Sequence, residues 1–187
     1  MEQRDQRVGK LGGNNMSATH FERVSYEQFR KDMENLGLTY IFPNGGDQIR
    51  QAYDNIRLPR RATPDSAGYD FSLPFPVILR PGENITIPTG ICVELDPGQF
   101  LMCLPRSGLG FRYGLQLFNS AGVIDAGYIH GDNGGHIMAK ITIIGNRDMN
   151  LEAGDRFMQG IILPFATTVD DEPLQAVRTG GFGSTGA

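Results

Sequence analysis

The sequence lacks the features of several large protein classes. Its 187 residues include only two cysteines, Cys92 and Cys103, which stand in apolar stretches and form no CxxC pair. No apolar stretch reaches the length of about 18 residues that a membrane-spanning helix needs, and no apolar segment follows the charged start as a signal peptide requires. These absences predict a reduced, cytoplasmic chain with no disulfide and no membrane partner.

A basic excess is missing as well. Seventeen lysines and arginines stand against 21 aspartates and glutamates, which gives a formal net charge of −4. Because binding to a nucleic-acid polymer requires a basic surface, this charge argues against such a partner. A small anion remains compatible with it, since a few local arginines suffice. There is no GxGxxG or Walker A segment and no βαβ alternation, so a nucleotide site would have to lie in loops and between subunits.

The pattern divides the chain into three parts. Residues 1–55 form a predicted N-terminal extension, of which residues 1–20 are polar and expected to be disordered. A capping box at Ser25 and Gln28, followed by apolar residues on one face, predicts a helix that ends at Gly37. A second, weaker helix is expected over residues 47–57. A β domain is expected over residues 56–175, and residues 176–187 form a glycine-rich C-terminal arm.

The β domain is predicted from short apolar runs between Pro/Gly turns. Many short strands with regular turns are typical of an all-β sandwich or barrel. The expected strands are 77–79, 84–88, 91–95, 100–104, 115–118, 136–144 and 159–164.

Two clusters present a carboxylate beside apolar residues. Asp70 stands in the segment 67–71, AGYDF, and Asp125 in the segment 119–128, NSAGVIDAGY. An aspartate between aromatics is more often a turn or cap residue than a functional one. Asp125 is open to two interpretations, a general base with Tyr128 as a platform for a sugar or base, or a hairpin-turn aspartate beside a packed tyrosine.

Three further clusters combine cations, hydroxyls, amides and glycines. The segment 105–110, PRSGLG, has the chemistry of a phosphate site, or is an ordinary turn with a solvated arginine. The segment 156–161, RFMQGI, places two polar residues in a strand. They are part of a site, or else Arg156 is a charge at the sheet edge and Gln159 an interior amide with its hydrogen bonds satisfied. The segment 178–186, RTGGFGSTG, suits a flap over a nucleotide, although a disordered terminus has the same composition.

Taken in this order, the five clusters resemble the five motifs of the homotrimeric dUTP pyrophosphatases, or dUTPases, over about residues 56–186. The resemblance implies a jelly roll, or distorted β-barrel, and a homotrimer with three active sites shared between subunits. Each flexible C-terminal arm would reach across to close a neighbouring site. The implied reaction is Mg²⁺-dependent hydrolysis of dUTP to dUMP and pyrophosphate by in-line attack of water on the α-phosphate. It would limit uracil incorporation into DNA and supply dUMP for dTMP synthesis.

The resemblance also implies roles for single residues. Asp125 would be the general base, Asn119 would orient the water, Gln159 would act near the α-phosphate, and Asp70 would organise Mg²⁺ through water. The residues implied to bind the nucleoside are Asn119, Gly122, Val123, Ile124, Asp125, Tyr128, Met138 (through its main chain) and Phe182. Those implied to bind phosphates are Arg106, Ser107, Gly108, Gln159, Arg178, Gly183, Ser184 and Thr185.

The chain departs from the family pattern at two places. The tail is one residue short between Arg178 and Gly180, and the segment Ile129–His136 stands as an insertion after Tyr128. Such an insertion looks typical of phage and Firmicute members, which suggests a phage-like origin. His130, Asp132 and His136 are open to interpretation as metal ligands or as parts of a flexible hairpin loop.

Three other functions remain open. The first is a dCTP deaminase, or a bifunctional deaminase–dUTPase, of the same fold. No Glu stands in the region where the deaminase resemblance would place its catalytic acid. The second is a regulatory protein partner bound through the insertion or the N-terminal extension, in addition to catalysis. The third is a catalytically inactive β-sandwich module. All five clusters keep residue types that are able to do chemistry, which argues against this third function.

Overall fold

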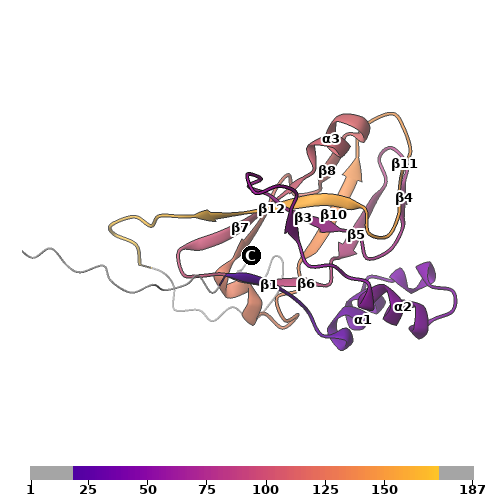
Figure 1. Ribbon diagram of the computed structural model, residues 1–187, viewed down its shortest axis with the longest axis horizontal. Helices are drawn as coiled ribbons and strands as arrows, with labels where there is room; N and C mark the ends of the chain where they lie inside the picture. Colours follow the sequence, from indigo (N-terminus) through magenta and orange to yellow (C-terminus); the bar gives the residue numbers. More distant parts are fainter. Residues whose placement is uncertain (1–18, 173–187) are drawn as a thin grey trace, which may run out of the picture.

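Antiparallel β-sheets are the main regular structure of residues 19–172, the part of the chain that this structure, a computed structural model, describes. The largest sheet has the order β2-β3-β12-β7-β9, and a second has the order β5-β10-β8 (Figure 1). Two small sheets pair β1 with β6 and β4 with β11. The expected all-β fold is therefore confirmed. The strands are β1 His20–Arg23, β2 Arg60–Arg61, β3 Tyr69–Ser72, β4 Val77–Leu79, β5 Asn84–Pro88, β6 Ile91–Glu94, β7 Gln99–Pro105, β8 Leu115–Leu117, β9 Gly122–Asp125, β10 Met138–Ile143, β11 Met149–Leu151 and β12 Arg156–Pro164.

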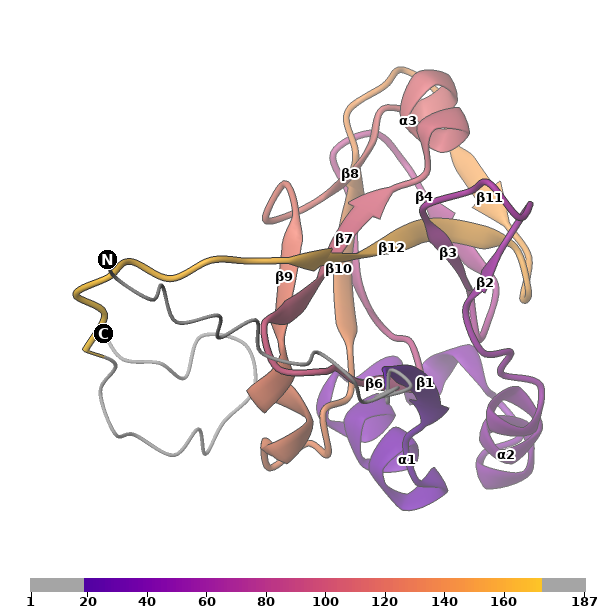
Figure 2. The same cartoon turned by 60° about the vertical axis from the view of Figure 1, so that its left-hand side comes forward.

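The helices lie at two opposite ends of the sheets. The first group is α1 (Tyr26–Asn35), the 3₁₀ turn η1 (Leu38–Ile41) and α2 (Gly46–Asp54), and α3 (Ser107–Tyr113) lies at the other end (Figures 1 and 2). A further 3₁₀ turn, η2 (Ala126–His130), follows β9. The predicted start of α1 is confirmed, because the Ser25 hydroxyl accepts a hydrogen bond from the Gln28 backbone N–H at 3.1 Å. Gly37 ends the segment with a φ of 65°, which glycine adopts without strain.

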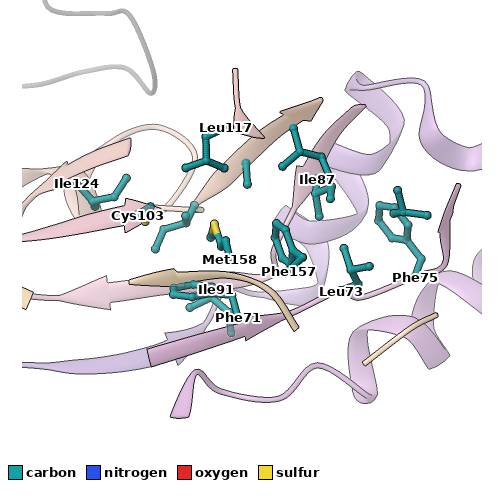
Figure 3. Close-up of a cluster of buried hydrophobic side chains, with 14 of the residues drawn as sticks. Phe71, Leu73, Phe75, Ile87, Ile91, Cys103, Leu117, Ile124, Phe157 and Met158 are labelled. Carbon is teal, nitrogen blue, oxygen red and sulfur yellow. The ribbon is translucent and has the colours of Figure 1, made fainter. Parts of the chain in front are cut away.

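The core forms because strand residues alternate between two faces. In β4 and β8, for example, the outer two residues are buried and the middle one is exposed. Figure 3 shows that side chains from different sheets point toward one another, among them Phe71, Ile87 and Phe157. Side chains from the N-terminal extension, including Phe29 and Met33, belong to the same buried cluster.

The structure corrects three expectations. Disorder is wrong for His20, which opens β1 and pairs with Glu94. Asp70 lies within strand β3 and not in a turn, because its neighbours Tyr69 and Phe71 pack on Phe21 of β1. The segment 105–110 is not a loop, since its second half begins α3. Residues 1–18 and 173–187, including the whole of the predicted arm 176–187, lie outside the described residues.

The boundary between extension and β domain stays a prediction, but the two parts share contacts. Phe21 of β1 lies opposite Val93 of β6, and the Val24 backbone N–H donates to the Gly90 carbonyl at 3.1 Å. No helix within residues 19–172 is long and apolar enough to span a membrane.

Candidate active site

Three of the five sequence clusters meet at one cleft. Strand β12 pairs with β3 on one side and β7 on the other, and Gln159 lies opposite both Asp70 and Leu104. This register brings the ends of the three strands together. The cleft that results has a volume of about 300 Å³. Its lining includes Gly68, Asp70, Arg106, Ser107 and Gln159, with Ala62, Ser66, Ala67 and Ile161.

Asp70 holds two arginines, Arg106 at this cleft and Arg156 at a cleft that adjoins it. Its Oδ1 lies 2.9 Å from Arg106 Nε, and its Oδ2 lies 3.0 Å from Arg156 Nη1. The carboxylate side chain is 11% exposed, whereas the two arginine side chains are 32% and 49% exposed. The aspartate therefore orients two guanidinium groups whose combined charge exceeds its own, and arginine is the side chain best suited to bind phosphate oxygens.

Gln159 reaches the cleft because Gly68 leaves room for it. A Cβ added at Gly68 would lie 2.4 Å from Gln159 Oε1, closer than atoms can approach. The Gln159 amide nitrogen lies 3.4 Å from the Pro105 carbonyl oxygen, a long hydrogen bond. The amide is thus placed beside the arginines and can still turn toward a ligand.

A second cationic cleft adjoins the first and was not predicted from the sequence. It has a volume of about 340 Å³ and shares Asp70 and Ala62 with the first. Its lining includes Arg57, Arg60, Arg61 and Arg156. The signal in the sequence was the dense run of arginines at 57–61, just before the first cluster.

The described residues offer Mg²⁺ no complete protein cage. Within residues 19–172 there is no group of three or more His, Cys, Asp or Glu side chains that could hold a metal ion. Both oxygens of Asp70 are engaged by arginines. Because Mg²⁺ keeps several of its waters and binds through few carboxylates plus substrate phosphates, Asp70 fits a contact through water.

The third cluster forms a separate, smaller cavity. Asn119, Gly122 and Met138 line it together with Cys103, Leu117, Ile124, Ile137, Ala139 and Met158. A hairpin turn within residues 119–128, one of the two interpretations of Asp125, is not found, because β8 pairs with β10 and β9 pairs with β7. The turn at 118–121, where Ser120 has a φ of 65°, instead carries the chain from one sheet to the other. The pairing of β8 with β10, which continues in the hydrogen bond from the Phe118 N–H to the Lys140 carbonyl, brings Asn119 beside Met138.

Strand β9 lies close against β7 at this cavity. Gly122 pairs with Cys103, and a Cβ at Gly122 would lie 3.2 Å from Cys103 Cβ. Cys103 is 3% exposed, and burial raises the pKa of its thiol to about 12. Burial, with the nearby Glu22 charge, also raises the pKa of Cys92.

Asp125 ends β9 at a distance from the cationic cleft. It pairs with Phe100, whereas Arg106 directly follows Pro105 at the other end of β7. Five residues of strand separate Phe100 from Pro105, which at about 3.3 Å per residue is about 16 Å. Val123 and Asp125 are exposed, and Ile124 is buried. Within one chain, Asp125 and Arg106 are therefore too far apart to contact the same phosphate group.

Tyr128 is 1% exposed, and its hydroxyl donates to the His136 carbonyl at 2.9 Å. The interpretation of His130, Asp132 and His136 as a metal site is not supported, because the His136 ring contacts Asp32 and Gly90 instead. Nor is the end of this segment a free loop, since His136 is fully buried. The predicted arm residues Arg178, Phe182, Gly183, Ser184 and Thr185 lie outside the described residues.

Comparison with known proteins decides the family. The model of the dUTPase family matches residues 54–186. A deoxyuridine 5'-triphosphate nucleotidohydrolase from Lactococcus lactis is 39% identical over 146 residues, which are 76% of this chain and 97% of that protein. The chain belongs to the dUTPase family. A second dUTPase relative, from Hahella chejuensis, is 41% identical over 140 residues, 71% of this chain and 89% of that protein.

Solved dUTPase structures share the fold. The Streptococcus mutans dUTPase is 36% identical, with a TM-score of 0.54 over 59% of this chain and 88% of that one. A point mutant of the dUTPase from phage phi11 of S. aureus, whose structure shows a structural Mg(II) ion, is 23% identical, with a TM-score of 0.55 over 65% and 92% of the two chains. At that identity the phage protein supports the dUTPase fold alone, and a regulatory partner for this chain stays a prediction.

Proposed function

We propose that this chain hydrolyses dUTP to dUMP and pyrophosphate. The observation that carries the proposal is the cationic cleft in which the segments 67–71, 105–110 and 156–161 meet, in a member of the dUTPase family. The cleft places a hydroxyl, an amide and the Arg106 guanidinium side by side, and Asp70 orients both this group and Arg156 of the adjoining cleft, which is the chemistry of a polyphosphate site.

In this proposal the cleft holds the phosphate chain. Arg106 neutralises charge on the phosphates, with Ser107 and Gly108 beside it at the start of α3, and the Gln159 amide donates near the α-phosphate. Mg²⁺, when bound, spreads charge over the triphosphate and orients it. Asp70 would hold this ion through water. The arm residues Arg178, Gly183, Ser184 and Thr185 bind the β- and γ-phosphates, and Phe182 stacks on the base.

The nucleoside binds against the third cluster, over its cavity, whose volume of about 10 Å³ is too small to hold a base. The backbone of residues 122–124 and of Met138 pairs with the uracil edge, with Asn119 beside it. Cytosine presents the opposite donor pattern, and each mismatched buried polar group costs about 1–3 kcal/mol. Tyr128 packs against the deoxyribose, which requires its segment to uncover the ring that is buried in the described chain.

Asp125 acts as the general base. It removes a proton from a water whose oxygen forms a bond to the α-phosphorus, in line with the leaving group. The bond between the α-phosphorus and the bridging oxygen breaks, and that oxygen leaves with pyrophosphate. A positioned base contributes about 10²–10⁴-fold to such a step.

The site is shared between subunits of a homotrimer in this proposal. The separation of about 16 Å along β7 between the pairing positions of the two sites supports it, because the base of one subunit must meet the phosphates held by another. So does the end of the described chain. Residues 164–172 are exposed, and the segment beyond β12 extends away from the sheets (Figures 1 and 2). An arm that begins there can reach a neighbouring subunit.

The test is pyrophosphate release from dUTP, dCTP, dTTP and UTP, with Mg²⁺ and with EDTA. We expect fast release from dUTP alone, reduced by EDTA. Ammonia released from dCTP would instead establish the deaminase, and no release from any of the four would overturn the proposed reaction.

A further inference from the structure

A buried polar pair joins the N-terminal helix to the segment after β9. Asp32 of α1 lies 2.6 Å from His136 Nδ1 through its Oδ2. His136 is fully buried and Asp32 is 7% exposed. Figure 2 shows α1 beside the loop that follows β9. Residues 104 positions apart in the chain therefore meet in the interior.

The contacts determine which ring nitrogen carries the proton. The Gly90 backbone N–H donates to His136 Nε2 at 2.7 Å, so that nitrogen is an acceptor. The hydrogen of a neutral imidazole then sits on Nδ1 and is donated to the Asp32 carboxylate. The ring is held at both nitrogens and has one allowed orientation.

The N-terminal extension supports both partners of the ring. The Gln28 side-chain amide donates to Asp32 Oδ2 at 2.8 Å from one turn earlier in α1. The Phe29 ring packs on His136 with centroids 6.2 Å apart. Gly90, the other partner of the ring, has a φ of 74°, and its carbonyl accepts from the Val24 N–H of the extension at 3.1 Å.

His136 in turn holds the segment that carries the nucleoside residues. Its carbonyl accepts from the Tyr128 hydroxyl at 2.9 Å and from the Asn133 amide at 3.1 Å. The next residue, Ile137, is held by Thr89, whose hydroxyl donates to the Ile137 carbonyl at 2.7 Å. Met138 follows directly, and Asp125 directly precedes η2, the turn that carries Tyr128.

We propose that Asp32 and His136 are positioning residues for the nucleoside site. Neither touches substrate. Together they set the backbone at Met138 and the direction of the turn between Asp125 and Tyr128. The inference rests on the proposed dUTPase reaction and assigns part of the N-terminal extension to substrate selection. A polar pair suits this task because it accepts one geometry, whereas apolar packing tolerates several.

The experiment compares Asp32→Ala with Asp32→Asn in the full chain. We expect Asp32→Ala to lower the ratio of kcat/KM for dUTP over that for dCTP and UTP by about 10- to 100-fold, the range that displacements of about 1 Å produce. KM for dUTP should rise more than kcat falls. Asp32→Asn should restore most of the ratio, because its amide oxygen still accepts from Nδ1–H. Glu34→Ala, on the exposed face of α1, is the matched control.

Two measurements keep the proposal open to refutation. Oligomeric state and Tm show whether Asp32→Ala folds. If it does not fold, Asp32→Asn and Gln28→Leu replace it. We then expect the ratio of kcat/KM values to shift in the same direction by a smaller factor. Nitrogen-15 NMR of the wild-type imidazole should show the proton on Nδ1. An unchanged substrate ratio in folded Asp32→Ala, or in Gln28→Leu where Asp32→Ala does not fold, would overturn the proposal, as would a proton on Nε2. A wild type that does not hydrolyse dUTP would instead overturn the proposed function.

Discussion

At the scale of single residues, the cleft depends on charge placement and on one missing side chain. Asp70 forms ion pairs with both Arg106 and Arg156, and because its carboxylate is buried it keeps these arginines oriented. Gly68 has no side chain, and the Gln159 amide occupies the space where one would be. The site therefore relies on residues that do no chemistry themselves.

Gly68→Ala should lower kcat without unfolding the protein. The added methyl collides with the flexible end of Gln159 and moves the amide off the phosphate site. Loss of one hydrogen bond to a charged group costs about 1.5–3 kcal/mol, or about 10- to 100-fold in rate. Steady-state kinetics and Tm measure both effects, and Gly46→Ala, where a Cβ meets nothing within 4 Å, is the control. Full activity in Gly68→Ala would show that the amide position is unimportant.

Asp125→Asn should remove turnover and keep binding. The amide cannot accept the proton from water, so kcat should fall by at least about 10²-fold, while the dissociation constant of dUTP, measured by calorimetry, changes little. Asp132→Asn changes an exposed carboxylate in the following segment and should behave as wild type. A fully active Asp125→Asn enzyme would contradict the mechanism.

At the scale of elements, β7 joins the two sites and lies between β12 and β9 in the largest sheet. Cys103 of β7 pairs with Gly122 of β9 and is buried. Because a buried thiolate would have no solvation, the burial of Cys103 makes the stability of the fold depend on pH under alkaline conditions.

The free energy of unfolding should fall as the pH rises above about 9. The pKa of Cys103 is raised from 9.0 to about 12, so between these values the unfolded chain loses a proton that the folded chain keeps. The loss is at most about 1.4 kcal/mol per pH unit for one proton, and below pH 9 the term is constant. Urea unfolding of wild type and Cys103→Ala between pH 8 and about 11 isolates it, and parallel curves would contradict the expectation.

At the scale of the whole molecule, the geometry predicts a site built from more than one copy. The cationic cleft and Asp125 lie toward opposite ends of β7, and the chain leaves the sheets after β12. A closed symmetric oligomer brings the same two surfaces together at every interface.

Mixing two inactive variants tests this directly. Arg106→Ala removes the phosphate ligand and Asp125→Asn removes the base. After joint refolding at equal amounts, about a quarter of the sites in random trimers should combine the intact residue of each chain. Recovery of dUTP hydrolysis to about that fraction is the expected result, and each variant refolded alone is the control. A mixture that stays inactive would mean that each subunit carries a complete site.

Local features of this protein could be predicted from short patterns of residues. Turn glycines and alternating apolar residues act over a few neighbours, so β4 and β5 were predicted with the bounds that the structure shows, and α1 with its cap at Ser25. The family motifs likewise marked Asp70, Arg106 and Gln159, which the structure brings together.

Contacts between distant segments could not be predicted in this way and are seen first in the folded chain. No local rule predicts that β9 pairs with β7 and not with its neighbour in sequence, β8. The pairing of β9 with β7 places Asp125 away from the arginines. Contact of Asp32 with His136, or of Arg57 with the cleft beside Asp70, depends on the packing of elements far apart in the chain. Such contacts are selected by the burial of the whole core, which short patterns in the sequence do not specify.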